Sequence, residues 1–537
     1  MGVLRLCVRE RPRWPGVARR LLILAPTVLA HALTALACGG AGPQQARLLP
    51  GPGGRLDPIY DVTIGYPATT LIINGLSYQG VEIGLEIEFD DASLRDDDPR
   101  FLAEARIASV MAGGVGQPFQ LLGPLDLQGT LDAGTFDSGL FGPIRVGTAD
   151  LILGLTGALQ AGGRHVAGSA TLFGSNDGGS FLAVKRRRYL VAGTDATSSI
   201  GEISVVTVKN DGPISVENDL EVISSDPVAR VEDGRPFIVN RLSFDNLQGL
   251  DPAAGFRTVF QYSTGPGSNP HDVVVLPPEE AGPDGGRSGL AFVTRYEPPE
   301  NDVAIFALDD GTLVDRIDLA PYARNPDHLP RPDQALLHDG LLYVTMEDAN
   351  GTFTQFMTGR VVVIDPLLRE VVDVIDLVGQ NPFESLLFAP DTGLIYAAMA
   401  GIFQGRLAQA LTGGVETIDP VARRSQGLLV DDDALGGNVS AVAVTSATRG
   451  YCVVSDATFH NFVKAFDPTT GELLETVFAT SDEIATIESD GDGYLLIAAT
   501  SFFDPRIVIL DAASGRRVAD LPARLPPFSF AILTRSL

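Results

Sequence analysis

The chain contains little cysteine, tryptophan, methionine or histidine for its length, and these shortages exclude several kinds of site. Its 537 residues include three cysteines, one tryptophan, five methionines and six histidines. These counts do not favour an aromatic-rich carbohydrate pocket or a haem pocket, and a site built from several histidines is not expected. The sequence also lacks a Gly-x-Ser-x-Gly elbow, a Cys-x-x-Cys-His haem attachment motif and a Walker loop. No residue is therefore assigned a catalytic role.

Positive charge is scarce as well. Lys and Arg total 39 against 67 Asp and Glu, which gives a formal net charge of −28. Nucleic-acid binding requires a basic face, so nucleic acid is excluded as a partner. Acidity of this size keeps a protein soluble and attracts divalent cations, of which calcium is the one candidate cofactor.

The N-terminus has the pattern of an export signal over residues 1–37. Six arginines, at positions 5, 9, 11, 13, 19 and 20, precede an apolar run from Leu21 to Ala37. A basic segment, a short apolar core and small residues before a break are typical of such signals. The run is short for a membrane span, which needs about 20 apolar residues.

The signal ends in TALAC, which resembles the lipobox of bacterial lipoproteins. The resemblance implies cleavage before Cys38 and acylation of that cysteine, although Ala35 stands where Leu is commonest. A plain secretory signal cut near Ala37 is the alternative. Residues 38–55 would then be the lipidated cysteine and a Gly/Pro-rich flexible tether. We therefore expect an exported protein, lipid-anchored at the outer membrane or the periplasmic face. Of the other cysteines, Cys7 leaves with the signal and Cys452 is expected to be buried packing.

A unit of about fifty residues recurs from residue 188 to the C-terminus. Each copy has two short apolar strands, then a polar loop, then a β-branched strand that ends in a turn such as DPTTG (467–471). The first strands open near Pro227, Asn269, Pro332, Asn381, Gly437, Asp482 and Pro527, at spacings of 42 to 63 residues. Short strands bounded by turns at this period are typical of four-stranded propeller blades.

Counting strands predicts how the ring closes. Residues 188–193, 201–208 and 218–224 supply three strands with no first strand before them, whereas the C-terminal PFSFAIL is a first strand with nothing after it. Joining the two ends completes one blade and removes the exposed edges. We therefore predict a seven-bladed β-propeller over residues 188–537, closed by the C-terminal strand.

Residues 56–187 show no blade unit. Apolar and polar residues alternate in YDVTIGYPATTLIINGLSYQGVEIGLEIEFDD (60–91), which predicts half-buried strands. The expected fold is a small antiparallel β-sandwich or barrel, with room for one helix in DPRFLAEARIASVMAGG (98–114). The whole chain is therefore predicted to be all-β.

Several segments resemble the repeat of YVTN propellers, a group that includes bacterial YncE-like proteins and related lipoproteins. They are LYVTMED (342–348), AFVTRYE (291–297) and RVVVIDPLLREVVDVIDLVG (360–379). The resemblance covers about two thirds of the chain. It implies the fold but no single activity, because members include binding proteins and relatives of lactonases and redox-enzyme propellers. The repeat itself contains no catalytic residue.

The starts of first strands and the ends of second strands meet on one face of a propeller, around its central channel. Six residues at such positions are predicted to bind a ligand: Asn240, Arg241, His271, Asp272, Arg295 and Asp348. The same face is expected to carry Asn269, Glu297, Asp333, Glu347, Asn381, Glu384, Asp456 and Asp482. His271 and Asp272 also fit a capped turn in NPHD (269–272), and that alternative stays open.

Two functions fit this face. The first is non-enzymatic: a monomeric envelope lipoprotein whose propeller is a scaffold that binds an envelope protein, a peptide or a small ligand. The alternative is a calcium-type, lactonase-like hydrolase in which Asp272, His271, Glu347 and Asp348 hold the cation. A redox accessory protein that docks an electron-transfer partner is a third candidate. The segment ESDGDGY (488–494) looks like a calcium loop but is expected to be a hairpin turn.

Overall fold

The computed structural model describes residues 59–73, 76–90, 100–121, 125–132, 135–146, 149–160, 165–172, 178–195, 200–209, 214–242, 244–403 and 407–533. The predicted signal, Cys38 and the tether lie outside these residues. Within them, helix is limited to the short segments α3 (Pro278–Ala281), η2 (Gly282–Gly285), η3 (Ala320–Tyr322) and α4 (Asp432–Leu435). The described chain is therefore all-β, as predicted, and it contains no helix that is long and apolar enough to cross a membrane.

The first ten strands form one antiparallel sheet that closes on itself. They are β1 (Ile59–Ile73), β2 (Leu76–Phe89), β3 (Arg100–Ala112), β4 (Val115–Gly116), β5 (Phe119–Leu121), β6 (Asp126–Asp132), β7 (Thr135–Val146), β8 (Ala149–Gln160), β9 (His165–Leu172) and β10 (Gly178–Lys185). Eight of them pair in the cyclic order β1, β10, β9, β8, β7, β6, β3, β2 and back to β1. The sheet is a closed eight-stranded barrel, one of the two predicted shapes, and closure leaves no free edge.

The helix expected within residues 98–114 is wrong, because residues 100–112 form β3. Buried and exposed residues alternate along this strand, with Phe101, Ala103 and Ala105 inside. Its alanines, glutamate and arginines favour a helix locally. The two-residue period nevertheless fits a strand, and β3 pairs with β2 on one side and β6 on the other to close the barrel. Tertiary pairing overrides local propensity here.

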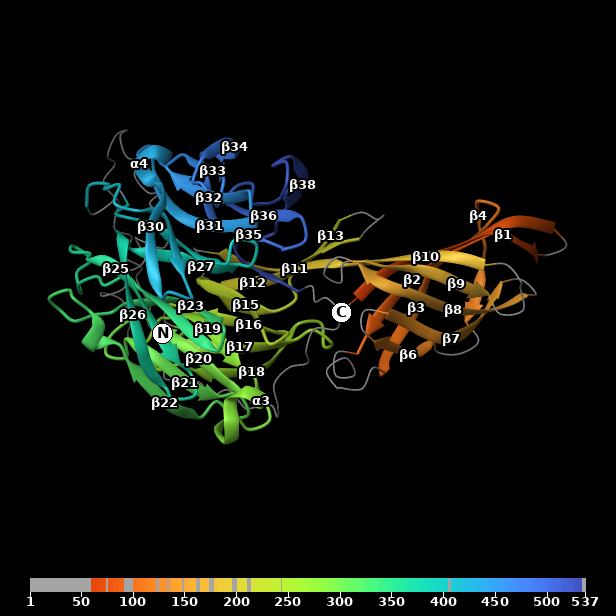
Figure 1. Cartoon of the computed structure of the whole chain (residues 1–537), viewed down its shortest axis with the longest axis horizontal. Helices are drawn as coiled ribbons and strands as arrows, with labels where there is room; N and C mark the ends of the chain where they lie inside the picture. Colours follow the sequence, from red (N-terminus) through yellow and green to blue (C-terminus); the bar gives the residue numbers. More distant parts are fainter. Residues whose placement is uncertain are drawn as a thin grey trace, which may run out of the picture.

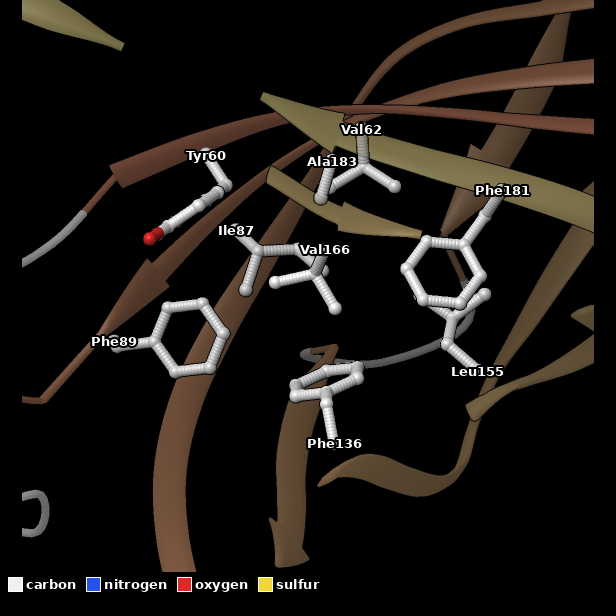
Figure 2. Close-up of a pocket in the computed structure, with 9 residues that line it drawn as sticks. All are labelled: Tyr60, Val62, Ile87, Phe89, Phe136, Leu155, Val166, Phe181 and Ala183. Carbon is white, nitrogen blue, oxygen red and sulfur yellow. The ribbon is translucent and has the colours of Figure 1, made fainter. Parts of the chain in front are cut away.

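Aromatic side chains fill the barrel. Phe89, Phe101 and Phe136 pack with ring centres 5.0 to 6.0 Å apart, and Tyr60 and Phe181 extend the cluster. Figure 2 shows the side chains around the small gap that remains between them, a cavity of about 10 Å³. Such a gap holds nothing larger than one water, so the barrel interior is a packed core.

The remaining strands form seven antiparallel sheets, the blades of a propeller (Figure 1). Blade 1 consists of β39 (Pro527–Ile532), β11 (Arg187–Asp195), β12 (Ile200–Val208) and the outer segments β13 (Ser215–Glu217) and β14 (Val222–Ser224). Blade 2 consists of β15 (Pro227–Glu232), β16 (Arg235–Asn240), β17 (Asn246–Asp251) and β18 (Arg257–Ser263). Blade 3 consists of β19 (Pro270–Leu276), β20 (Leu290–Arg295), β21 (Asp302–Ala307) and β22 (Leu313–Asp318). Blade 4 consists of β23 (Pro332–His338), β24 (Leu341–Met346), β25 (Thr358–Asp365) and β26 (Glu370–Gln380). Blade 5 consists of β27 (Pro382–Ala389), β28 (Leu394–Met399), β29 (Gly414–Asp419) and β30 (Arg424–Asp431). Blade 6 consists of β31 (Asn438–Ser446), β32 (Arg449–Ser455), β33 (Asn461–Phe466) and β34 (Leu473–Thr480). Blade 7 consists of β35 (Glu483–Ser489), β36 (Tyr494–Thr500), β37 (Arg506–Asp511) and β38 (Arg517–Pro522).

The two ends of the propeller chain meet in blade 1, which confirms the predicted closure. The C-terminal strand β39 pairs with β11, from Ile532 opposite Tyr189 to Pro527 opposite Gly193. The inner strand of every blade contacts the inner strands of both neighbouring blades, so the ring is complete. All seven inner strands begin within one residue of their predicted positions. The lone Cys452 is fully buried, as expected, and burial raises the pKa of its thiol to about 12.

Basic residues join the barrel to the propeller at the face where the inner strands end. β10 ends at Lys185 and β11 begins at Arg187. Lys185 Nζ lies 3.4 Å from a carboxylate oxygen of Asp492, and Arg187 Nε lies 3.3 Å from one of Asp490. Both aspartates belong to the turn between β35 and β36. The acidic ESDGDGY segment is thus a hairpin turn, as predicted, and its carboxylates face side-chain cations.

Candidate functional site

Each blade brings the start of its inner strand and the end of its second strand to one face, which we call the entry face. The register shows this in blade 2, where Pro227 is paired with Asn240, and in blade 4, where Pro332 is paired with Met346. The junction with the barrel lies on the opposite face. The entry face is therefore where the polar residues singled out from the sequence lie, and the barrel does not cover it (Figure 1).

Three adjacent inner strands are irregular just after they begin. The register shifts between Pro270 and Asp272 in β19, between Pro332 and Ala335 in β23, and between Pro382 and Leu386 in β27. Irregularities of this kind, β-bulges, turn side chains away from the regular alternation and are common beside functional sites. The polar side chains of these three segments meet one another around the mouth of the channel.

A histidine and an aspartate from blades 3 and 4 form a buried pair at this mouth. His271 Nδ1 lies 2.7 Å from Asp333 Oδ1, and both side chains are almost fully buried. The amide nitrogen of Asn269 lies 3.2 Å from His271 Nε2. If this amide donates to Nε2, Nδ1 carries the ring proton and donates to Asp333. Burial alone would raise the pKa of Asp333, but the hydrogen bond and charge of His271 hold that pKa below its ordinary value.

Arg241 crosses the mouth from blade 2 to blade 5. Its guanidinium group lies 2.7 Å from Asp226 Oδ1 and 3.5 Å from Glu384 Oε1. The arginine side chain is only 2% exposed, and its guanidinium carbon lies 5.6 Å from the centre of the Phe528 ring on β39. Glu384 adopts a φ of 61°, which is strained for a glutamate, and its backbone N–H donates to Asp333 at 3.0 Å. The two ion networks are therefore joined, and they span blades 1 to 5.

A second arginine lies further along the channel. Arg230 Nε is 2.6 Å from Asp272 Oδ1, and Arg230 Nη2 donates to Gln334 Oε1 at 2.8 Å. The other Asp272 oxygen accepts from the backbone N–H of Ala335 at 3.0 Å. The Arg230 side chain is 25% exposed although it starts from an inner strand, so it borders the water-accessible part of the channel. Blades 2, 3 and 4 are tied together at this level.

Four half-buried glutamates on the inner strands give the channel an acidic lining. Burial raises the pKa of Glu232 to about 8 and the pKa values of Glu384, Glu483 and Glu488 to about 7, against an ordinary value of 4.5. The negative charge of Glu384 adds to the shift at Glu483. No hydrogen bond or ion pair joins the Glu483 or Glu488 side chain to another described residue. The channel therefore has more carboxylates than cations.

We expect the propeller to become less stable as the pH rises from about 5 to 8. In this interval the unfolded chain has already lost the protons that the four glutamates keep in the folded state, so folding takes up protons. Each carboxyl then lowers the free energy of unfolding by on the order of 1 kcal/mol per pH unit until its folded pKa is passed. Melting curves at several pH values measure this slope. Replacing both Glu483 and Glu488 by Gln should flatten it, whereas Glu472→Gln, at an exposed turn, should leave it unchanged.

An arginine held between aromatic rings lies beside the histidine pair. The guanidinium carbon of Arg331 lies 5.0 Å from the ring centre of Tyr296 and 4.4 Å from that of Phe353. Arg331 also forms an ion pair with Glu297. The Tyr296 ring stacks on His271 at 4.2 Å between centres, and its hydroxyl donates to Glu347 at 2.5 Å. Burial raises the pKa of Glu347 well above its ordinary value, and the hydrogen bond from the Tyr296 hydroxyl opposes this shift.

The structure brings together only some of the six predicted ligand-binding residues. Arg241, His271 and Asp272 take part in the channel networks described above. Asn240 is fully buried and bonds within its blade and to the Ser224 amide. Arg295 is held by Asp302 through contacts of 2.6 and 2.7 Å. Asp348 accepts from the backbone N–H groups of Arg324 and Asn325 at 2.8 and 2.9 Å. These last three hold strands and loops in place, and a ligand role for any of the six stays a prediction.

Sequence reasoning missed several residues of the channel. They are Arg230, Glu232, Gln334, Glu483, Glu488, Tyr296 and Arg331. The sequence does contain a signal for the charged residues on inner strands. The segments PVARVE (227–232) and EIATIE (483–488) carry charges in strands that would be apolar if they were fully buried. No sequence signal pairs Arg331 with Tyr296 and Phe353, because that contact joins two different blades.

The residues suggested for a calcium site are engaged elsewhere. Asp272 pairs with Arg230, His271 with Asp333, and Asp348 with the Arg324 loop. Among the described residues, no three His, Cys, Asp or Glu side chains are grouped so that they could hold a metal ion. The arrangement does not fit the cation site of the hydrolase alternative.

Comparison with known proteins adds only distant likenesses. No protein family model and no curated protein sequence matches the chain. A candidate 6-phosphogluconolactonase from Bacteroides fragilis is 14% identical over 65% of this chain and 98% of its own, with a TM-score of 0.45. Apo AztD from Citrobacter koseri is 14% identical over 65% and 98%, with a TM-score of 0.40, and a protein from Lactobacillus plantarum is 13% identical over 65% and 99%, with a TM-score of 0.48. Scores and identities this low carry no argument about activity. The strand pairing of the chain itself establishes the propeller, while membership of the YVTN group and the lipid anchor stay predictions.

Proposed function

We propose that this propeller protein is an exported, lipid-anchored component of the cell envelope that binds a protein, peptide or small ligand at its entry face without chemical turnover. The observation that carries the proposal is the ion network at the channel mouth. It joins side chains from blades 2 to 5 by contacts of 2.7 to 3.5 Å and buries them. A network that is satisfied in this way fixes the positions of the surrounding loops, and preorganised loops bind at a lower entropic cost.

The position of the barrel supports the same proposal. The barrel joins the propeller through Lys185 and Arg187 at the face where inner strands end. An anchor attached ahead of the barrel would therefore leave the entry face open to a partner (Figure 1). The export signal and the TALAC segment supply the argument for the lipid.

No observation favours the hydrolase alternative. It needs a cation with open coordination positions, whereas Asp272 is engaged by Arg230, His271 by Asp333, and Asp348 by backbone N–H groups. Calcium stays a prediction from the acidic composition alone.

Site-specific photo-cross-linking in bacterial cells that export the full chain tests the proposal. A photoreactive phenylalanine analogue is placed at Phe244, which is 43% exposed on the entry face, or at Val421, which is 89% exposed on the opposite face. We expect discrete higher-mass adducts from position 244 and none from position 421. Equal yields from both positions, or no adduct from 244, would contradict ligand binding at this face.

The anchor is checked in the same cells with a Cys38→Ser variant. We expect the wild-type chain in the membrane fraction and the variant in the soluble fraction after export. Recovery of both in the soluble fraction would leave a secreted protein in place of a lipoprotein.

A further inference from the structure

Exposed phenylalanines are concentrated on the entry face. In the described part of the propeller, four phenylalanines expose more than about a third of their surface: Phe244 (43%), Phe459 (41%), Phe502 (50%) and Phe503 (100%). All four lie in segments that join a second strand to a third strand, in blades 2, 6 and 7. Large apolar side chains that face water at one location mark interaction surfaces, and aromatic residues are enriched there.

On the opposite face the exposed apolar side chains are aliphatic rather than aromatic. Its turns between third and fourth strands expose aliphatic side chains, among them Leu367 (63%), Leu368 (65%) and Val421 (89%). The aromatic residues are thus segregated, and Leu367 and Leu368 are a natural internal control for a pair of adjacent exposed apolar residues.

Three of the phenylalanines lie on two adjacent blades, and we call Phe459, Phe502 and Phe503 the aromatic rim. The amide of Asn461, at the end of the Phe459 loop, donates to the carbonyl of Asp482 at 2.9 Å. Asp482 directly precedes β35, the inner strand of blade 7, and Phe502 and Phe503 follow β36 of the same blade. The two loops that carry the rim therefore flank Asp482 on adjacent blades.

Unpaired acidic groups border the rim. Asp482 is exposed, and its carboxylate has no hydrogen-bond or ion-pair partner among the described residues. The neighbouring Glu483 is half-buried at the channel mouth. The charge that acts on its pKa is that of another carboxylate, Glu384, which raises it further. Asp504 differs, because Arg506 Nε lies 3.0 Å from it. The rim thus combines aromatic surface with carboxylates that lack a counter-charge, so a complementary partner must bring cations and apolar groups together.

We propose that the aromatic rim docks a cationic, amphipathic peptide segment of a partner protein. Apolar side chains of the segment contact Phe459, Phe502 and Phe503, and a lysine or arginine lies over Asp482 and Glu483. This inference rests on the proposed binding role of the entry face and names its partner chemistry. A lipid bilayer is the other occupant that suits exposed phenylalanines. Unpaired carboxylates and a net charge of −28 disfavour an anionic membrane surface.

Fluorescence anisotropy with the full chain tests the proposal. The probe is a fluorescein-labelled synthetic peptide of alternating lysine and leucine or phenylalanine. Two matched peptides replace either every lysine by glutamate or every apolar residue by serine. We expect the first peptide to bind about ten-fold or more tightly than either of the others. The double variant Phe502→Ser/Phe503→Ser should weaken its binding by about ten-fold or more, and Asp482→Asn should weaken it several-fold.

The control variant Leu367→Ser/Leu368→Ser should bind the peptide like the wild type. Wild-type binding by both double variants would show general attraction to an acidic protein, and equal loss in both would show non-specific apolar adhesion. Either result would overturn the proposal. Sedimentation with phosphatidylcholine vesicles that is lost in Phe502→Ser/Phe503→Ser would assign the rim to a membrane instead. Cross-links at position 244 without peptide binding would defeat this inference alone, whereas the absence of both would defeat the proposed function as well.

Discussion

A chain that ends at Ala523 is expected to lose its folded propeller. The truncation removes β39, which supplies the inner strand of blade 1 and its whole ladder with β11. It also removes the buried side chains of Phe528, Phe530 and Leu533, each worth about 1.5–3 kcal/mol of burial. Their sum is comparable to the total stability of about 5–15 kcal/mol that folded domains possess. Opening the ring adds to this loss, because the inner strands β35 and β15 no longer have a strand between them.

Solubility after expression and circular dichroism melting measure this effect. The matched control ends at Leu533 and keeps every residue of β39, so it should melt like the full chain. A soluble truncated protein with an unchanged cooperative transition would mean that blade 1 is not needed for closure.

Replacement of Arg241 by methionine is expected to destabilise the protein by about 3–5 kcal/mol, because it leaves buried carboxylates without their counter-charge. The arginine is 2% exposed and contacts both Asp226 and Glu384. Methionine retains most of the volume, so the loss measures charge rather than packing. Denaturant unfolding at pH 8 gives the free energy. The surface variant Arg517→Met, whose side chain is 51% exposed, should cost less than about 1 kcal/mol.

A second substitution separates this explanation from a general packing defect. Adding Glu384→Gln to Arg241→Met should restore part of the stability, because a neutral amide needs no cation. Lower pH should have the same effect on the single variant, since the pKa of Glu384 is already raised to about 7 by burial in the wild type. An Arg241→Met protein within about 1 kcal/mol of wild type would show that the crossing pair contributes little.

Repetition makes the propeller predictable from sequence. A strand pattern that recurs seven times fixes each strand by comparison with its copies. A blade without its first strand at one end, and a lone first strand at the other, require the closure seen between β39 and β11. The barrel has no such repeat. Its strand β3 contains helix-favouring residues, and its closure depends on a pairing between its first and last strands, β1 and β10, that no local pattern specifies.

The candidate site is less predictable, because side-chain partners lie on different blades. The sequence indicates which face His271 and Arg241 occupy. It does not show that Asp333 and Glu384 reach them, because bulges in β23 and β27 reorient the chain there. The turn with Asp490 and Asp492 makes the same point. Its partners are Lys185 and Arg187, about 300 residues earlier, and an isolated acidic turn resembles a calcium loop.

Closure through β39 also sets an order of events during biosynthesis. The barrel is complete once Lys185 has emerged, and blades 2 to 7 are complete by Pro522, but blade 1 waits for the last strand of the chain. Until then β11 presents an open edge that is able to pair with other chains. Closure of the ring therefore depends on the few residues of β39, and a chain that stops before them keeps an unpaired strand edge at β11 of the kind that aggregates.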